Sequence, residues 1–189
     1  MFIHEKEFSA AYNKGSPIRI ADGLGKIETI PLQPERIEFI KNNFWYHENT
    51  DFSECINKDE KCGHRMPELR KKLLSFGGEE TCLPVIESDL LNILERGQLW
   101  LGDRVTLIEG RPSRCHENSS ILWHKNKNKY VLCTGYALSP DGLWRQHSWC
   151  VQLNPKKNRI IETTVKRLAY FGFVMNDEEA RKFLIANYY

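Results

Sequence analysis

Residues 129–164 read KYVLCTGYALSPDGLWRQHSWCVQLNPKKNRIIETT. Within this stretch, Lys129–Leu138 and Leu143–Leu153 are rich in apolar and β-favouring side chains, and the SPDG sequence at 139–142 between them favours a turn. A third run of the same kind, Arg159–Thr164, follows a second polar turn. Three such runs separated by short turns predict consecutive strands that pair as an antiparallel meander.

Helical patterns occur on both sides of the predicted meander. Cys115–Trp123 follows a turn-rich segment and is expected to form a helix that begins at the cysteine. Upstream, Met66–Phe76 and Ser88–Arg96 are predicted helices that end at glycines, and Asn176–Tyr189 begins with a capping residue and an acidic first turn. The sequence therefore predicts an α+β fold in which the helix beginning at Cys115 packs on the meander, with a mostly helical amino-terminal half.

The chain divides into two regions that we expect to form one compact domain. Residues 1–97 combine helical and irregular sequence and are predicted to pack on a core formed by residues 98–189. A chain of 189 residues is long enough to bury such a core. Tyr170-Phe171-Gly172, after the third predicted strand, is interpreted as a packed loop.

Composition argues against several functional classes. The formal net charge is +2 and the basic residues are scattered, which disfavours a nucleic-acid-binding protein. No apolar run is long enough to cross a bilayer, and the amino terminus has no basic segment followed by an apolar one, so we expect a cytoplasmic protein without a membrane partner. Without a secretory signal, the six cysteines are expected to be thiols, with Cys133 and Cys150 packed inside strands.

Cys115 differs from the other cysteines because it lies in a polar, turn-rich segment at the start of a predicted helix. A helix amino terminus stabilises a thiolate, and a thiol nucleophile needs a base nearby. His147 on the middle strand is the candidate base, and period-two alternation places it on one face with Trp149 and Val151. If the helix packs on that face, the thiol and the imidazole converge.

Glu162, on the neighbouring strand, is the candidate third member of a triad. A carboxylate at this position can accept a hydrogen bond from the far ring nitrogen of His147 and so fix its orientation. The oxyanion that forms during attack on a carbonyl also needs hydrogen-bond donors. The backbone N–H of Cys115 is one candidate donor, and Gln98 or Trp100 is another.

Asn118 and Trp149 are candidate substrate contacts beside the predicted triad. The alternatives are that Asn118 satisfies backbone groups at the start of the helix and that the tryptophan belongs to the core. Cys55, Cys62 and His64 are residue types that bind zinc, but their spacing fits no common structural site. We therefore expect neither a metal nor a cofactor.

Four short motifs occur in an order that resembles the transglutaminase-like superfamily of cysteine enzymes. They lie within about residues 98–172 and are Arg114-Cys115-His116, Gly135-Tyr136-Ala137, His147-Ser148-Trp149 and Glu162-Thr163-Thr164. The separations are 32 residues from Cys115 to His147 and 15 from there to Glu162. Two features depart from the family pattern, because glutamate replaces the usual aspartate and the segment before Cys115 lacks a glycine-rich lead.

The resemblance implies a papain- or transglutaminase-like core and a thiol-dependent hydrolase or acyl-transferase of an amide-type bond. The reaction would proceed through a thioester intermediate. Peptidase, amidase, deamidase and transglutaminase activities all remain open, and the substrate would be a protein, a peptide or a small amide. The alternative function is a non-catalytic binding protein that keeps the fold with an idle triad.

Overall fold

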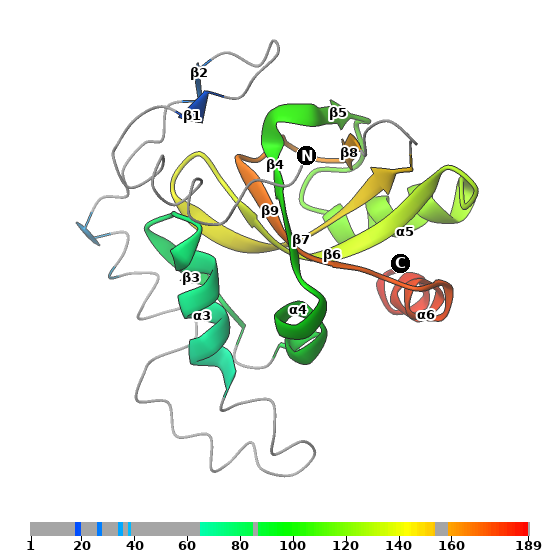
Figure 1. Ribbon diagram of the computed structural model, residues 1–189. Helices are drawn as coiled ribbons and strands as arrows, with labels where there is room; N and C mark the ends of the chain where they lie inside the picture. Colours follow the sequence, from blue (N-terminus) through cyan, green and yellow to red (C-terminus); the bar gives the residue numbers. More distant parts are fainter. Residues whose placement is uncertain are drawn as a thin grey trace.

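The computed structural model describes residues 65–84, 87–153 and 159–188, together with short pieces at 18–19, 26–27, 34–35 and 38. Downstream of residue 65 these residues form an α+β fold, a curled mixed sheet with four helices (Figure 1). The strands β1 (Ile18–Arg19) and β2 (Lys26–Ile27) pair with each other in a separate antiparallel ribbon. Within the described part of the chain, no helix has the length and apolar character needed to span a bilayer.

The predicted antiparallel meander is present. It consists of β6 (Tyr130–Leu138), β7 (Leu143–Gln152) and β8 (Arg159–Glu162). β6 pairs with β7 along its whole length, whereas β8 pairs with β7 at residues 150–152 alone. The edge of β7 at residues 147–148 therefore lies beyond the reach of β8, which matters for the position of Cys115.

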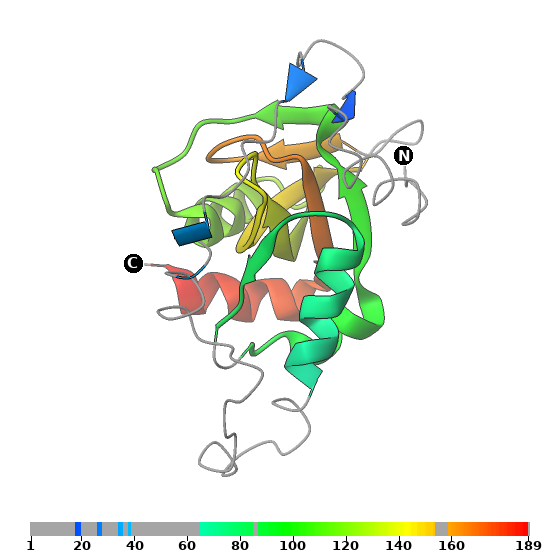
Figure 2. The same ribbon diagram turned by 90° about the vertical axis from the view of Figure 1, so that its left-hand side faces the viewer.

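The rest of the sheet comes from strands outside the meander. They are β3 (Glu80–Cys82), β4 (Gln98–Leu101), β5 (Val105–Leu107) and β9 (Ala169–Val174). The main order is β4-β9-β6-β7-β8-β5, with β5 parallel to β8 and β3 parallel to β7. Because the single turn η3 (Gly102–Arg104) joins β4 to β5 at opposite ends of this order, the sheet must curl back on itself (Figures 1 and 2).

The interpretation of Tyr170-Phe171-Gly172 as a loop is wrong. These residues lie in β9, which is paired with β4 on one side and β6 on the other. An interior strand is buried on both faces, so its sequence is a continuous apolar run without the alternation that identifies a half-exposed strand.

The four predicted helices are present, each within two residues of its expected bounds. They are α3 (Met66–Ser75), α4 (Leu90–Arg96), α5 (Cys115–Lys125) and α6 (Asp177–Asn187). α3 ends before Gly77, which adopts the left-handed φ of 115° that suits glycine. α6 begins with a capping box between Asn176 and Glu179.

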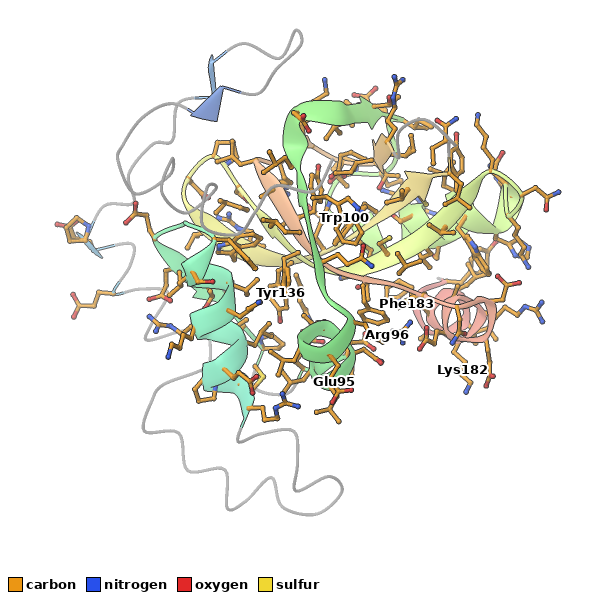
Figure 3. All side chains as sticks on the ribbon, viewed as in Figure 1. Glu95, Arg96, Trp100, Tyr136, Lys182 and Phe183 are labelled. Carbon is orange, nitrogen blue, oxygen red and sulfur yellow. The ribbon has the colours of Figure 1, made fainter. Side chains whose placement is uncertain are left out.

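Two clusters of buried side chains lie on the two faces of the sheet. The helices pack on the outer face through apolar residues that include Leu73, Ile93, Trp123 and Ala180. The inner cluster, on the concave face, contains strand residues alone and consists of Trp100, Cys133, Ala137, Trp149, Val151, Ile160 and Tyr170. Figure 3 shows Trp100 and Tyr136 on opposite sides of the sheet, in agreement with their clusters. Cys133 and Cys150 are both buried in strands, as predicted.

The condition that α5 packs on the face of His147 is not met, because α5 packs on the opposite face. The Ser119 hydroxyl donates to the Ser148 carbonyl at 3.0 Å, and the Cys150 thiol donates to the Ser119 carbonyl at 3.3 Å. The face of His147 is filled by the aromatic side chains of the inner cluster, which leaves the helix the other face with its small residues.

Candidate active site

The Cys115 thiol lies on the first residue of α5, immediately after a tight turn. The Arg114 N–H bonds the Arg111 carbonyl at 3.3 Å, and Ser113 between them has a left-handed φ of 59°. Arg114 precedes the helix and provides no side-chain cap, so the first backbone N–H groups of α5 receive no side-chain acceptor from the capping position. The N–H groups at a helix start favour a nearby anion, so this position favours the thiolate form of Cys115 over the thiol.

The segment that leads to this turn is tied to the residues around Glu162. The Ile108 N–H donates to the Glu162 carbonyl and the Gly110 N–H donates to the Thr163 carbonyl, each at 2.8 Å. The amide of Asn118 closes the loop, since its oxygen accepts from the Arg111 N–H at 3.1 Å and its nitrogen donates to the Arg111 carbonyl at 2.8 Å. Asn118 therefore holds backbone near the helix start, and its amide is committed there and not to a substrate.

The thiol reaches His147 around the open edge of β7. Beyond the end of β8, the backbone of Ser148 helps to lower the pKa of Cys115, and its carbonyl accepts from the Ser119 hydroxyl at 3.0 Å. A residue of α5 thus satisfies a backbone carbonyl that a longer β8 would have paired. This arrangement lets a helix on the outer face present its first residue to an imidazole on the inner face.

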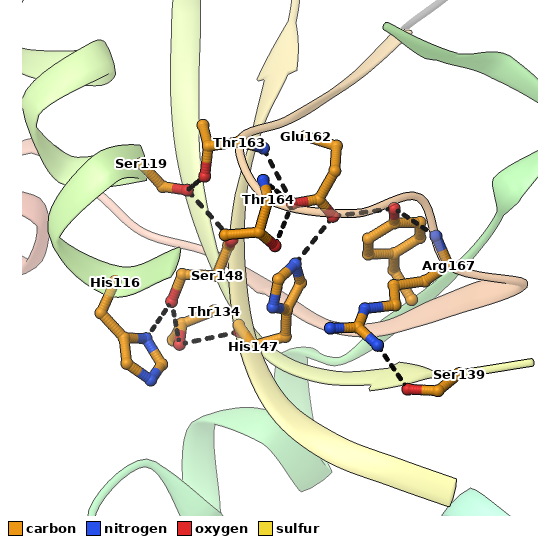
Figure 4. Close-up of polar contacts among 11 residues, drawn as sticks. His116, Ser119, Thr134, Ser139, His147, Ser148, Glu162, Thr163, Thr164 and Arg167 are labelled. Carbon is orange, nitrogen blue, oxygen red and sulfur yellow. Dashed lines mark hydrogen bonds and ion pairs between the residues drawn. The ribbon is translucent and has the colours of Figure 1, made fainter. Parts of the chain in front are cut away.

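His147 and Glu162 form a buried ion pair on the inner face (Figure 4). The His147 Nε2 lies 2.8 Å from Oε2 of Glu162, which also accepts from the Tyr170 hydroxyl at 3.0 Å. The other oxygen, Oε1, accepts from the Thr163 N–H at 2.8 Å, the Thr164 N–H at 2.9 Å and the Thr164 hydroxyl at 3.0 Å. Both oxygens are hydrogen-bonded, and the His147 Nδ1 is left for the thiol.

Burial and partners shift the pKa values of the triad in the directions that favour charge separation. Burial raises the pKa of Cys115, but hydrogen bonding to His147, the His147 charge and the Ser148 N–H together bring the pKa below its ordinary value. Burial lowers the pKa of His147, but Cys115 and Glu162 outweigh it and raise the pKa to about 9. Burial also raises the pKa of Glu162, and His147 with the two threonine amides reverses this effect.

Tyr170 is expected to stabilise the carboxylate, and Tyr170→Phe tests this. The change removes one donor to Glu162 and leaves the Arg167 N–H, which bonds the hydroxyl at 3.2 Å, without its acceptor. We expect the free energy of unfolding to fall by about 1–2 kcal/mol in urea denaturation. Tyr130→Phe is the matched control, because Tyr130 is also buried and no hydrogen bond of its hydroxyl occurs among the described residues. Equal losses in the two variants would contradict the role of Tyr170.

A second histidine lies on the opposite side of β7 from His147 (Figure 4). The His116 Nδ1 is 2.7 Å from the Ser148 hydroxyl, which donates to the Thr134 hydroxyl at 2.9 Å. The Thr134 hydroxyl in turn donates to the His147 carbonyl at 3.4 Å. Since each hydroxyl has one proton, this direction requires His116 to donate from Nδ1. Burial, with the charge of His147, lowers the pKa of His116 to about 4, so this ring is neutral at pH 7.

The remaining sequence candidates lie away from the thiol or within the core. Gln98 is exposed on β4, in register with Gly172, and is three strands from His147. Trp100 packs edge-on against Trp149 with ring centroids 5.6 Å apart, and both belong to the inner cluster. The Cys115 backbone N–H, the other predicted oxyanion donor, lies at the first residue of α5.

Three residues of the site escape sequence reasoning. Tyr170 and Thr164 bind the Glu162 carboxylate, and Ser148 joins the backbone of β7 to α5. In the sequence, Tyr170 lies in a segment interpreted as a packed loop. Thr164 is interpreted as a β-favouring residue, and Ser148 occupies an alternating position on its strand. For Tyr170 one signal exists, because a tyrosine in an apolar run must find a partner for its hydroxyl.

No group of three or more His, Cys, Asp or Glu side chains suited to a metal ion occurs among the described residues. Cys55, Cys62 and His64 lie outside those residues. The four cysteines that the structure describes, Cys82, Cys115, Cys133 and Cys150, are thiols. Comparisons of the chain with protein-family models, with curated proteins and with solved structures find no match.

Proposed function

We propose that the protein is a thiol-dependent hydrolase or acyl-transferase that acts on an amide-type bond. The observation that carries the proposal is geometric: the buried Nε2 of His147 lies 2.8 Å from Oε2 of Glu162, which leaves Nδ1 for the thiol of Cys115 at the start of α5. The partners of Cys115 lower its pKa and those of His147 raise its pKa to about 9, and both shifts favour the thiolate and the imidazolium, the reactive form of a cysteine nucleophile.

The mechanism follows from the positions of the three side chains. The Sγ of Cys115 attacks the carbonyl carbon, and the resulting oxyanion faces the N–H groups at the start of α5. The C–N bond then breaks as Nδ1 of His147 gives its proton to the leaving amine, and a thioester remains on the sulfur. Water or an amine attacks the thioester, passes a proton back to the imidazole and restores the thiolate. Glu162 holds Nε2 throughout.

We also propose that residues 98–172 form a transglutaminase-like or papain-like core. The support is a helix that begins at the nucleophile, an antiparallel strand that carries the base and a neighbouring strand that carries the carboxylate. Peptidase, amidase, deamidase and transglutaminase reactions share these elements and differ in the acceptor. A protein, a peptide or a small amide is the proposed substrate.

Acylation by p-nitrophenyl acetate tests the function without knowledge of the natural substrate. We expect a burst of p-nitrophenolate and one acetyl group, located by peptide mass spectrometry on Cys115. The burst should vanish in Cys115→Ala and persist in Cys82→Ala, since both thiols are half-buried but Cys82 lies on β3. Acetylation spread equally over Cys82 and Cys115 would mean an idle triad and would support the binding-protein alternative.

A further inference from the structure

Arg167 lies in the connection between β8 and β9, close to the carboxylate of the proposed triad. Its backbone N–H bonds the Tyr170 hydroxyl at 3.2 Å, and that hydroxyl donates to Glu162 at 3.0 Å. The next residue anchors the connection to β6, because the Leu168 N–H donates to the Leu138 carbonyl at 2.8 Å. The backbone of Arg167 is thus two hydrogen bonds from the group that orients the imidazole.

The guanidinium of Arg167 has an unusual set of partners. It lies on the same side of β7 as His147 and Glu162 (Figure 4). Its Nη1 donates to the Ser139 hydroxyl at 2.6 Å, and its Nε is buried with no acceptor. Among the described residues, the guanidinium of Arg167 makes this one hydrogen bond, to Ser139. No carboxylate of those residues forms an ion pair with Arg167.

Other half-buried arginines of the same structure show what is missing. Arg70 binds Glu80 through Nε and Nη2, each at 3.0 Å, and Arg145 binds Asp141 through Nη1 and Nη2 at 2.8 Å and 2.6 Å. The Nε–Nη2 edge holds a carboxylate in Arg70, whereas in Arg167 the same edge has no hydrogen-bond partner among the described residues.

A half-buried guanidinium that no carboxylate of the described residues bonds favours the binding of an anion. Its N–H groups have lost part of their hydration, so an acceptor that satisfies them gains more than it would at an exposed arginine. The two parallel N–H groups of the Nε–Nη2 edge match the two oxygens of a carboxylate.

We propose that the Nε–Nη2 edge of Arg167 binds a carboxylate of the substrate, so that the amide presented to Cys115 carries an acidic group nearby. This inference rests on the proposed function and adds the charge of the substrate to it. An acidic side chain or a chain-terminal carboxylate supplies the same chemistry. The distance between the carboxylate and the reacting carbon distinguishes these two sources.

Alkylation with matched pairs of reagents measures this preference directly. The pairs are iodoacetyl-glycine and iodoacetyl-6-aminohexanoate, each compared with its own N-methylamide, and the readout is the second-order rate constant at Cys115. We expect the acid to react roughly tenfold faster than the amide at one spacer length. A preference for the short spacer indicates a carboxylate next to the reacting bond, and a preference for the long spacer indicates one farther away.

Variants then assign the preference to Arg167. The acid-to-amide ratio cancels any change in the thiol pKa, and it should fall to about one in Arg167→Gln. Arg167→Lys keeps the charge without the two-pronged edge and should retain part of the preference. Arg159→Gln removes an equal charge from an exposed position on β8 and should keep the ratio of the wild type.

Failures of this inference and of the proposed function look different. A ratio near one for the wild-type protein at both spacer lengths, with Cys115 still the preferred site of alkylation, overturns the role of Arg167 and leaves the thiol enzyme intact. An acid-to-amide ratio in Arg167→Gln equal to that of the wild type also overturns the role of Arg167 and leaves the thiol enzyme intact. Alkylation that does not prefer Cys115 overturns both. The acid-to-amide ratio of the wild type is measured without any variant, so this part of the test does not depend on whether a variant folds.

Discussion

Replacement of His147 by alanine is expected to slow the alkylation of Cys115 at pH 7 by roughly one to two orders of magnitude. Burial is the largest influence on the thiol and raises its pKa, and His147 is the main group that opposes it. Without the imidazole, the pKa should rise to the ordinary value of 9.0 or higher. A thiol with that pKa is about 1% ionised at pH 7, and the thiolate alone reacts.

The pH profile of alkylation by iodoacetamide checks this expectation. The inflection should lie below pH 9.0 in the wild type and at or above it in His147→Ala. His147→Gln keeps a donor for Glu162 and should match the alanine variant in rate while remaining more stable. His116→Ala is the matched control, since that ring is also near the thiol but is neutral at pH 7, so its loss should change the inflection far less. An unchanged inflection in both His147 variants would show that the imidazole does not activate the thiol.

Gly172→Ala is expected to lower the free energy of unfolding by about 3 kcal/mol or more. A Cβ at Gly172 would lie 2.1 Å from the Thr134 carbonyl oxygen and 2.9 Å from the Gly135 Cα. Both atoms belong to the backbone of β6, which cannot move aside as a side chain can. Because Gly135 is also the register partner of His147, a shift of β6 would disturb the strand that carries His147.

Gly142→Ala provides the comparison for this prediction. Gly142 has a φ of 83° in the turn between β6 and β7, so alanine there is strained by its backbone conformation. The expected loss is about 1–2 kcal/mol. Urea denaturation of the two variants should therefore rank Gly172→Ala as clearly the more damaging. A smaller loss for Gly172→Ala would show that β6 and β9 separate more easily than their close approach indicates.

Local patterns in the sequence were sufficient to predict the meander and the start of α5. Turn residues at 139–142 and the polar turn before Arg159 delimit strands whose register is fixed by short connections. The turn-rich segment before Cys115 identifies the beginning of the helix. These features predict the thiol, the imidazole and the carboxylate on adjacent elements, but they do not predict the face of the sheet on which α5 packs.

Packing between distant segments could not be predicted in the same way. β3 and β5 are three residues long, and each exists because it pairs with a strand more than 50 residues away in the sequence. The face on which α5 packs depends on what fills the other face, and the inner cluster draws Trp100 and Tyr170 from outside the meander. Alternation along β7 gives two faces and does not say which one a helix will cover.

The partners of individual polar groups were the least predictable part of the site. Glu162 was inferred from its strand position, but besides His147 the hydrogen-bond donors to its carboxylate come from the following turn and from β9. Among the described residues no carboxylate bonds the guanidinium of Arg167, and only the folded chain reveals this. A sequence shows that an arginine is present, but it does not show which arginines have found a carboxylate.

The position of β9 between β4 and β6 has a consequence for the order in which the chain folds. The meander has neighbours close in sequence, so β6, β7 and β8 can pair as soon as they are formed. β4 precedes all of them in the sequence. It has no neighbour in the sheet until β9, the last of the described strands along the chain, has paired with β6. We therefore expect Cys115, His147 and Glu162 to assemble early, and the arrival of Tyr170 with β9 to complete their surroundings in the final step of folding.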